Sequence, residues 1–332
     1  MAGCTTGQWL AAWLAGRQSL RPLTRRSYQH HLDTYLLPRI GNIPLAMLTA
    51  ADLRGMFTAI GRQRPAAGAP LSPAIREGLI SVNPARLVEL PAPARPHPVV
   101  WTAPREAAWR QAGARPAVAV WTAEQTARFL AAIRGEPLYP CYQLMAVSGL
   151  RRGEAAGLRW CDIDFAGTTL TVSRQLQETS RGLVLPPKSI AGNRVLALDP
   201  WTLQVLAAHR DRQQLPAGCD GYVFAQPGGR PYLPGYLTRR FAMLVRREGL
   251  PPIRLHDLRH GAATLALASG AGLKAIQAML GHASIILTAD TYTSVLPHLA
   301  GATAEAVAAQ ILKAARTPGL TAASPWPHAP AT

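Results

Sequence analysis

A histidine and an arginine stand three residues apart in the segment His256-Asp257-Leu258-Arg259-His260. On a helix, residues three apart are neighbours on one face, so this spacing presents an imidazole beside a guanidinium. The guanidinium can stabilise an anion, and the imidazole can move a proton. The alternative for an isolated pair of this kind is a helix start whose polar residues satisfy its own capping needs. The pair alone leaves both interpretations open.

Two further candidate residues lie downstream of this pair. His282 follows Gly281, and a histidine beside a helix-ending glycine is usually structural. Tyr292, taken alone, is interpreted as a half-buried aromatic residue. The order of these residues, together with an arginine motif and a lysine turn upstream, carries more information than any one of them.

Five motifs follow one another along the chain. Their order and spacing are typical of the tyrosine recombinase (phage integrase) family, which the chain closely resembles. They are Ser148-Gly149-Leu150-Arg151-Arg152-Gly153-Glu154, Pro187-Lys188-Ser189, His256-Asp257-Leu258-Arg259-His260, Leu280-Gly281-His282 and Asp290-Thr291-Tyr292. The segments WLAAWLAG and LPRIGNIPLAMLTAADL are similar to the family's core DNA-binding domain, and residues 121–316 to its catalytic domain. The resemblance implies a site-specific DNA recombinase or integrase.

The resemblance assigns a role to each matching residue. The catalytic set is Arg151, Lys188, His256, Arg259, His282 and the nucleophile Tyr292. Glu154 occupies an acidic position that supports the first arginine in the family. Asp257 and His260 are expected to be structural neighbours in the motif.

The chemistry of these side chains agrees with the implied roles. A phenol of pKa about 10 is a poor nucleophile at neutral pH, so Tyr292 needs a base, for which His256 is the candidate. The two arginines would bind non-bridging phosphate oxygens, and His282 would donate a further hydrogen bond. Lys188 would protonate the departing 5′ oxygen. The implied 3′-phosphotyrosyl intermediate needs neither ATP nor a metal ion, and the sequence contains no Walker loop or HExxH motif.

The elements that must position these residues are predicted to be mainly helical, with a small antiparallel sheet. In the N-terminal region Thr24 and Thr49 are expected helix caps, and Thr122 with Gln125 forms a capping box that opens a second domain. Period-two patterns predict a three-stranded meander over residues 169–198. Later helices are expected over residues 200–212, 237–248, 256–269, 273–280 and 303–315.

The predicted organisation is an all-α core DNA-binding domain over residues 1–90, a proline-rich linker over 91–120, an α+β catalytic domain over 121–316 and a disordered tail over 317–332. The core-binding domain departs from the family near residues 74–76, where roughly five turns of a long helix are missing. This departure supports an alternative function, a catalytically impaired remnant that binds DNA without exchanging strands. A type IB topoisomerase is a third and less favoured interpretation.

The composition favours a polyanionic partner. The 332 residues carry 35 lysines and arginines against 18 acidic residues, a formal net charge of +17. Double-stranded DNA is the expected partner, with Arg25 and Arg26 as candidate contacts, although a codon bias toward arginine is an alternative source of the charge. Four scattered cysteines and the lack of a long apolar run predict a cytoplasmic protein without a membrane partner.

The resemblance also implies an assembly. Recombination between two duplexes requires a homotetramer on DNA, and a directionality factor is a further expected partner. The amphipathic helix over residues 303–315 is expected to pack either on its own domain or on a neighbouring subunit.

Overall fold

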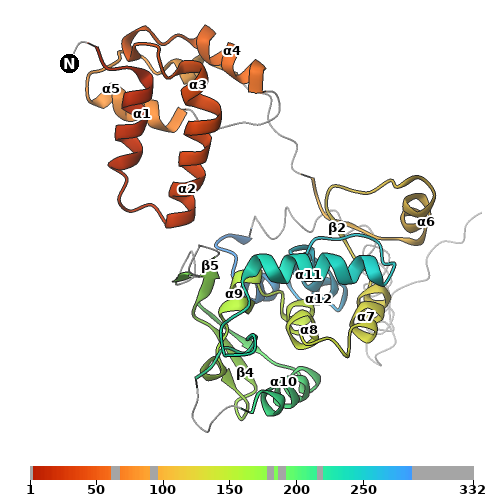
Figure 1. Cartoon of the computed structure of the whole chain (residues 1–332). Helices are drawn as coiled ribbons and strands as arrows, with labels where there is room; N and C mark the ends of the chain where they lie inside the picture. The colour runs from red at the N-terminus through yellow and green to blue at the C-terminus, as the bar shows by residue number, and fades with distance from the viewer. Residues whose placement is uncertain are drawn as a thin grey trace, which may run out of the picture. The chain divides into compact units, whose positions relative to one another are not determined.

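The computed structural model divides the chain into two compact units, Met1–Ala94 and Arg95–Thr332 (Figure 1). It describes residues 3–60, 68–89, 96–177, 183–185, 192–214 and 220–285. Outside these described residues lie Lys188, Tyr292, the helix expected over 303–315 and the tail 317–332. Among the described residues, no helix is long and apolar enough to cross a membrane.

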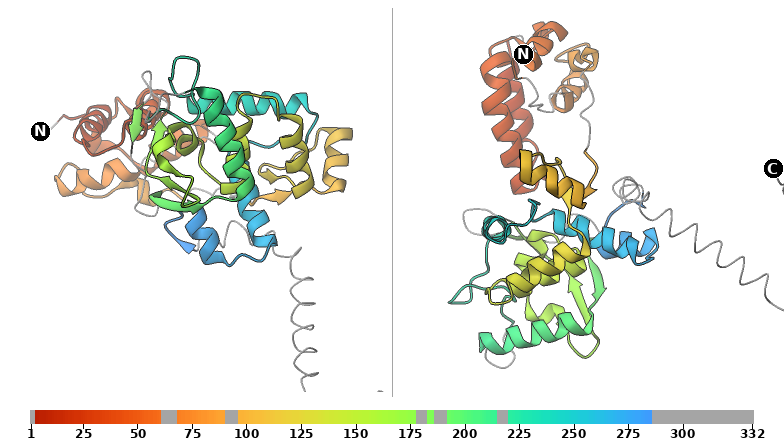
Figure 2. Two further views of the ribbon diagram at one scale, coloured as in Figure 1. Left: turned by 90° about the horizontal axis from the view of Figure 1, so that it is seen from below. Right: turned by 90° about the vertical axis from the view of Figure 1, so that its right-hand side faces the viewer.

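The described part of the first unit is built from helices. Its elements are α1 (Thr6–Ala15), α2 (Pro22–His31), the π-helical turn η1 (Leu32–Leu36), α3 (Leu37–Ile40), η2 (Leu45–Met47), α4 (Ala50–Ile60), α5 (Gly68–Arg76) and η3 (Pro84–Leu87). Helices α1 and α2 lie side by side (Figure 2). The core of this unit includes Trp9, Leu10 and Leu53.

Capping explains where the helices of the first unit begin. Thr5 forms a capping box with Gln8 before α1, and the Thr49 hydroxyl accepts from the Asp52 N–H at 3.2 Å before α4. The expected cap at Thr24 is wrong, because α2 already begins at Pro22. A proline fixes a helical φ angle and lacks an N–H that the first turn leaves unbonded, so it is well suited to this position.

The second unit combines helices with short strands. In chain order it contains β1 (Val99–Val100), α6 (Ala103–Ala112), β2 (Ala119–Val120), α7 (Ala123–Ala132), α8 (Tyr139–Ser148), α9 (Arg152–Gly157), η4 (Trp160–Asp162), β3 (Ile163–Asp164), β4 (Thr169–Val172), β5 (Gln175–Gln177), β6 (Leu183–Leu185), β7 (Arg194–Ala197), α10 (Pro200–Gln213), α11 (Pro234–Arg247), α12 (Asp257–Ala268) and α13 (Leu273–Leu280). The predicted fold class, mainly α with a small antiparallel sheet, is confirmed.

The strands do not form the expected three-stranded meander. β4 pairs with β3 on one side and β7 on the other, whereas β5 and β6 form a separate antiparallel hairpin. In the β4–β7 register Leu170 faces Leu196, and both side chains are buried. Pairing in this register keeps the apolar face of each strand on the core. β5 instead lies beside α9 (Figure 1).

The proline-rich segment expected to be irregular contains regular structure. Thr102 precedes α6, and Pro104 lies in the first turn, where its missing N–H breaks no helical hydrogen bond. β1 and β2 pair in parallel, and Trp101 beside them is buried. The indole Nε1 of Trp101 donates to the Pro252 carbonyl at 3.3 Å. Residues 96–120 therefore pack as part of the second unit.

Helix α8 is central to the core of the second unit. All of its residues except Val147 are buried, as in a helix surrounded by protein on every side. It contacts α7, α9, α10 and α12, and its Tyr142 packs with the rings of Phe129 and Phe241. This packing fixes the C-terminal end of α8, where the candidate site begins.

Candidate active site

The turn between α8 and α9 places the first arginine of the site. Gly149 ends α8 with a φ angle of 66°, and a Cβ at this position would lie 2.9 Å from Cδ2 of Leu280. Glycine therefore meets two demands, the left-handed backbone and the close approach of α13. The turn brings Arg151 to the N-terminal cap of α9.

Glu154 fixes both the backbone and the side chain of Arg151. Its Oε2 accepts the Arg151 N–H at 2.9 Å, and its Oε1 accepts from Arg151 Nη1 at 2.8 Å. The Glu154 side chain is 3% exposed. Burial by itself raises the pKa of Glu154, but the hydrogen bonds and charge of Arg194, with the charge of Arg151, lower the pKa overall. Glu154 is therefore an ionised carboxylate at neutral pH.

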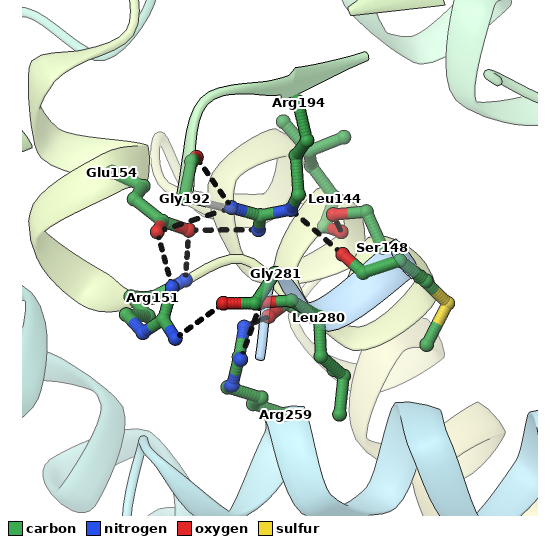
Figure 3. Close-up of polar contacts among 11 residues, drawn as sticks. Leu144, Ser148, Arg151, Glu154, Gly192, Arg194, Arg259, Leu280 and Gly281 are labelled. Atoms are coloured by element: carbon green, nitrogen blue, oxygen red, sulfur yellow. Dashed lines mark hydrogen bonds and ion pairs between the residues drawn. The ribbon is translucent and has the colours of Figure 1, made fainter. Parts of the chain in front are cut away.

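The second arginine, Arg259, is held from two directions. It lies in the first turn of α12 and is buried. Its Nη1 donates to the Gly149 carbonyl at 2.7 Å, and its Nη2 donates to the Leu280 carbonyl at 2.5 Å (Figure 3). Because these carbonyls belong to two different segments, the planar guanidinium is held in one orientation.

Three arginines converge on the C-terminal end of α13 (Figure 3). The donor–acceptor pairs are Arg194 Nε with the Met279 carbonyl at 2.8 Å, Arg259 Nη2 with the Leu280 carbonyl at 2.5 Å and Arg151 Nη2 with the Gly281 carbonyl at 3.3 Å. The last carbonyls of a helix have no intrahelical partner and lie at the negative end of its dipole, so they attract guanidinium groups. The resulting cluster of positive charge is suited to an anion with several oxygens, such as a phosphate.

Two histidines beside this cluster carry neutral imidazole rings at neutral pH. Desolvation by the surrounding protein, followed by the charges of His260 and Arg259, lowers the pKa of His256 to about 4. Burial, followed by the charges of Arg259 and Arg151, lowers the pKa of His282 to about 4. A neutral imidazole can accept a proton or donate one hydrogen bond, so either ring can take part in proton transfer.

The two motif neighbours expected to be structural make structural contacts. Asp257 is 2% exposed and accepts from the backbone N–H of Arg254 at 2.9 Å and from its Nη2 at 2.7 Å. The ring of His260 packs edge-on against the ring of His256, with centroids 5.1 Å apart. These contacts hold the first turn of α12, from which Arg259 projects.

The structure gathers part of the catalytic set expected from the sequence. Arg151, Arg259 and Glu154 lie around the end of α13, where His282 follows within two residues, and His256 lies one turn before Arg259. Lys188 and Tyr292 fall outside the described residues. No group of three or more acidic, histidine or cysteine side chains placed to bind a metal ion occurs in the described ranges.

The two candidate DNA contacts of the first unit differ from each other. Arg25 donates from Nη1 to the Leu14 carbonyl at 2.9 Å and from Nη2 to the Arg17 carbonyl at 2.5 Å, so it binds the C-terminal end of α1. Arg26 is exposed. The structure therefore gives Arg25 a structural role, and the DNA contact expected of each residue stays a prediction.

Sequence reasoning missed Arg194, whose side chain is 6% exposed and pairs with Glu154. A signal was present in the strand pattern. With a period of two, Arg194 lies on the same face of β7 as the buried Leu196, whereas Val195 between them is exposed. An arginine on the buried face of a strand requires polar partners inside the protein.

The chain is similar to known proteins in its sequence. The model of the Phage integrase family matches residues 120–298. A protein named Tyrosine recombinase XerC-like, from Caldanaerobacter subterraneus subsp. tengcongensis, is 24% identical over 326 residues, covering 88% of this chain and 80% of that protein.

Solved structures share the fold. The Tn1549 transposon integrase in complex with transposon right end DNA matches with a TM-score of 0.70 and 20% identity, over 89% of this chain and 98% of that one. A lambda integrase tetramer bound to a Holliday junction matches with a TM-score of 0.63 and 18% identity, over 88% of this chain and 78% of that one.

Proposed function

The chain belongs to the phage integrase family and is a site-specific DNA recombinase, and we propose that it cuts and rejoins double-stranded DNA with Tyr292 as the nucleophile. The observation that carries this assignment of roles is the convergence of Arg151 and Arg259 on the end of α13. Two guanidiniums fixed before the substrate arrives are suited to the non-bridging oxygens of one phosphate.

The arginines stabilise charge in the proposed reaction. As the Tyr292 oxygen attacks phosphorus, negative charge grows on the non-bridging oxygens, and Arg151 and Arg259 donate hydrogen bonds to them. His282 donates a further hydrogen bond to the same phosphate. Because the described groups are held by carbonyls and by Glu154, little reorganisation accompanies the charge development.

The proton transfers complete the proposed step. His256, which is neutral at pH 7, accepts the phenol proton of Tyr292 as the bond from oxygen to phosphorus forms. The bond from phosphorus to the 5′ oxygen breaks, and Lys188 gives its proton to that oxygen. The products are a 3′-phosphotyrosyl enzyme and a free 5′-hydroxyl, which attacks a phosphotyrosyl link on the partner duplex to rejoin the strands.

The proposed assembly is a homotetramer on two duplexes. The lambda integrase tetramer on a Holliday junction, whose fold this chain shares, supports this proposal. A directionality factor is the further partner we propose, and recombination by the purified chain with and without host extract tests for it. Nothing in the described part of the site favours a catalytically impaired remnant.

The proposal is tested with a nicked suicide substrate that carries an attachment site. The wild-type chain is expected to form a covalent protein–DNA adduct that resists denaturation, and Tyr292→Phe is expected to form none while its Kd for DNA stays within about threefold. Peptide mapping of the adduct identifies the linked residue. An adduct that persists in Tyr292→Phe contradicts the assignment of the nucleophile.

A further inference from the structure

Arg194, at the start of β7, uses its whole guanidinium to join three segments of the site. Its Nη2 donates to Glu154 Oε2 at 3.0 Å, and its Nη1 donates at 3.2 Å both to Glu154 Oε1 and to the Gly192 carbonyl. Its Nε donates to the Met279 carbonyl at 2.8 Å (Figure 3). The side chain is 6% exposed, so it is largely shielded from solvent.

Each joined segment carries a residue of the proposed catalytic set. Glu154 lies one turn after Arg151 on α9, and Met279 lies three residues before His282 at the end of α13. β7 itself follows Lys188 by six residues in the sequence. Arg194 therefore links α9, the end of α13 and β7.

The sharing of Glu154 explains how such a tie affects Arg151. Glu154 Oε1 accepts from one nitrogen of Arg151 and one of Arg194, and Oε2 accepts from the Arg151 backbone and from Arg194. The Arg151 guanidinium thus donates to the carboxylate only through Nη1, and its Nη2 donates to the Gly281 carbonyl. Without Arg194, the buried carboxylate would regain free lone pairs, which favour a two-bond pairing with the Arg151 guanidinium.

We propose that Arg194 is a positioning residue for strand cleavage, which holds Glu154 so that the Arg151 guanidinium stays directed at the scissile phosphate. This inference rests on the proposed function, because it concerns the same reaction. It differs from a purely structural role in one respect: it acts on the rate of the bound complex more than on folding or on DNA affinity.

The experiment uses the full-length chain and the nicked suicide substrate. Arg194→Met removes the charge at similar length, and Arg194→Lys keeps the charge but offers one ammonium group, which cannot reach Glu154 and Met279 together. The adduct formation rate at saturating DNA is expected to fall about 100-fold in Arg194→Met, with about tenfold recovery in Arg194→Lys. The DNA concentration that gives half the maximal rate is expected to change less than about threefold.

A control separates positioning from the loss of an ion pair with a buried carboxylate. Arg174 pairs with Asp162, whose side chain is 5% exposed, at 3.2 Å, and this pair makes no contact among those that hold the site arginines. Arg174→Met is expected to lower Tm while the saturating cleavage rate stays within about twofold of wild type. Should Arg194→Met fail to fold, Arg194→Lys gives the same rate comparison.

A double-mutant cycle tests whether Arg194 acts through Glu154. If it does, Glu154→Gln combined with Arg194→Met reacts no more than about threefold slower than the slower single variant. Fully multiplicative effects overturn the inference, as does a wild-type rate in a folded Arg194→Met chain. Failure of the wild-type chain to form any adduct contradicts the proposed function instead, so the two failures are distinguishable.

Discussion

The arginines of the candidate active site and Arg26 of the first unit differ in how they are held. In the second unit Arg259 is 2% exposed and Arg194 is 6% exposed, and both donate to backbone carbonyls at the end of α13. In the first unit Arg26 is exposed on α2. A guanidinium fixed by the fold is oriented before DNA binds, whereas an exposed one contributes an attraction that salt screens. One residue type thus serves two physical tasks.

This difference gives the net charge of +17 a more specific meaning. Charge summed over the chain favours association with DNA but places no atom for chemistry. Catalysis by arginine requires partners that fix the guanidinium, and in this chain these are Glu154 and the last carbonyls of α13. Substitutions in the two units should therefore affect different measured quantities.

Substitution of Arg259 is expected to have the largest effect. In Arg259→Lys a single ammonium replaces two nitrogens that bind Gly149 and Leu280, so the cation is no longer oriented. We expect the adduct formation rate at saturating DNA to fall about 1000-fold, in the range for loss of one oriented donor in a transition state. Quenched-flow or gel assays on the suicide substrate measure this rate.

The control for Arg259→Lys is its affinity for DNA. Because lysine keeps the positive charge, Kd is expected to stay within about threefold of wild type. A large loss of affinity with an unchanged rate in the bound complex would show that Arg259 acts in DNA binding and not in cleavage.

Glu154→Gln is expected to have an intermediate effect on cleavage. The amide keeps the shape of the side chain but removes the negative charge that Arg151 and Arg194 share. We expect the saturating rate to fall about 10- to 100-fold, because the two guanidiniums repel each other and Arg151 loses its anchor. The stability of this variant supplies a second measurement.

The pH dependence of unfolding separates Glu154→Gln from wild type. The folded-state pKa of Glu154 is lowered, so its ionised carboxylate stabilises the fold above its unfolded pKa of about 4.3. This contribution is lost as the pH falls through the folded-state pKa. Urea titrations should show wild type more stable than Glu154→Gln at pH 7, with a smaller difference at pH 3. An equal difference at both pH values contradicts this account.

Much of the fold was predictable because its signals are local. Capping boxes and helix periodicity lie within a few residues, and they indicate the start of α7 after Thr122 and the extent of α13 over Leu273–Leu280. Strand pairing was not predictable in the same way. The β4–β7 register depends on which distant apolar faces meet in the core, so the meander over residues 169–198 was the wrong arrangement.

The residues of the site also divide into those that the sequence predicts and those that only the fold brings together. Ordered motifs pointed to Arg151 and Arg259, because a resemblance retains the order of residues along a chain. Arg194 was missed, because its partners Glu154 and Met279 are far from it in the sequence and only the fold brings them together. The carbonyls that hold the arginines were not predictable either, since every residue has one and only the geometry selects those of α13.

Mild acid is expected to destabilise the second unit through His256. The pKa of His256 is about 4 in the folded chain, against about 6.5 when unfolded. Between these values the unfolded state binds a proton that the folded state does not, so stability falls as the pH drops from 6.5 toward 4. Urea unfolding of wild type at pH 7 and pH 5 measures this loss of stability, and His256→Gln should lose less stability over the same pH change. An equal loss of stability in both chains contradicts the neutral state of His256.

The smallest effects are expected in the first unit, where two adjacent arginines sharpen the comparison within one helix. Arg26→Gln should weaken DNA binding about threefold and reduce the slope of log Kd against log salt by about one, because an exposed arginine acts on DNA by releasing counterions. Arg25→Gln should leave that slope unchanged and lower the free energy of unfolding by about 1 kcal/mol, since its guanidinium is used on the Leu14 and Arg17 carbonyls. Neither variant should alter the cleavage rate at saturating DNA. If Arg25→Gln instead changes the salt slope as much as Arg26→Gln, then an arginine bound to a helix end still contacts DNA, and fixation by carbonyls does not prevent that contact.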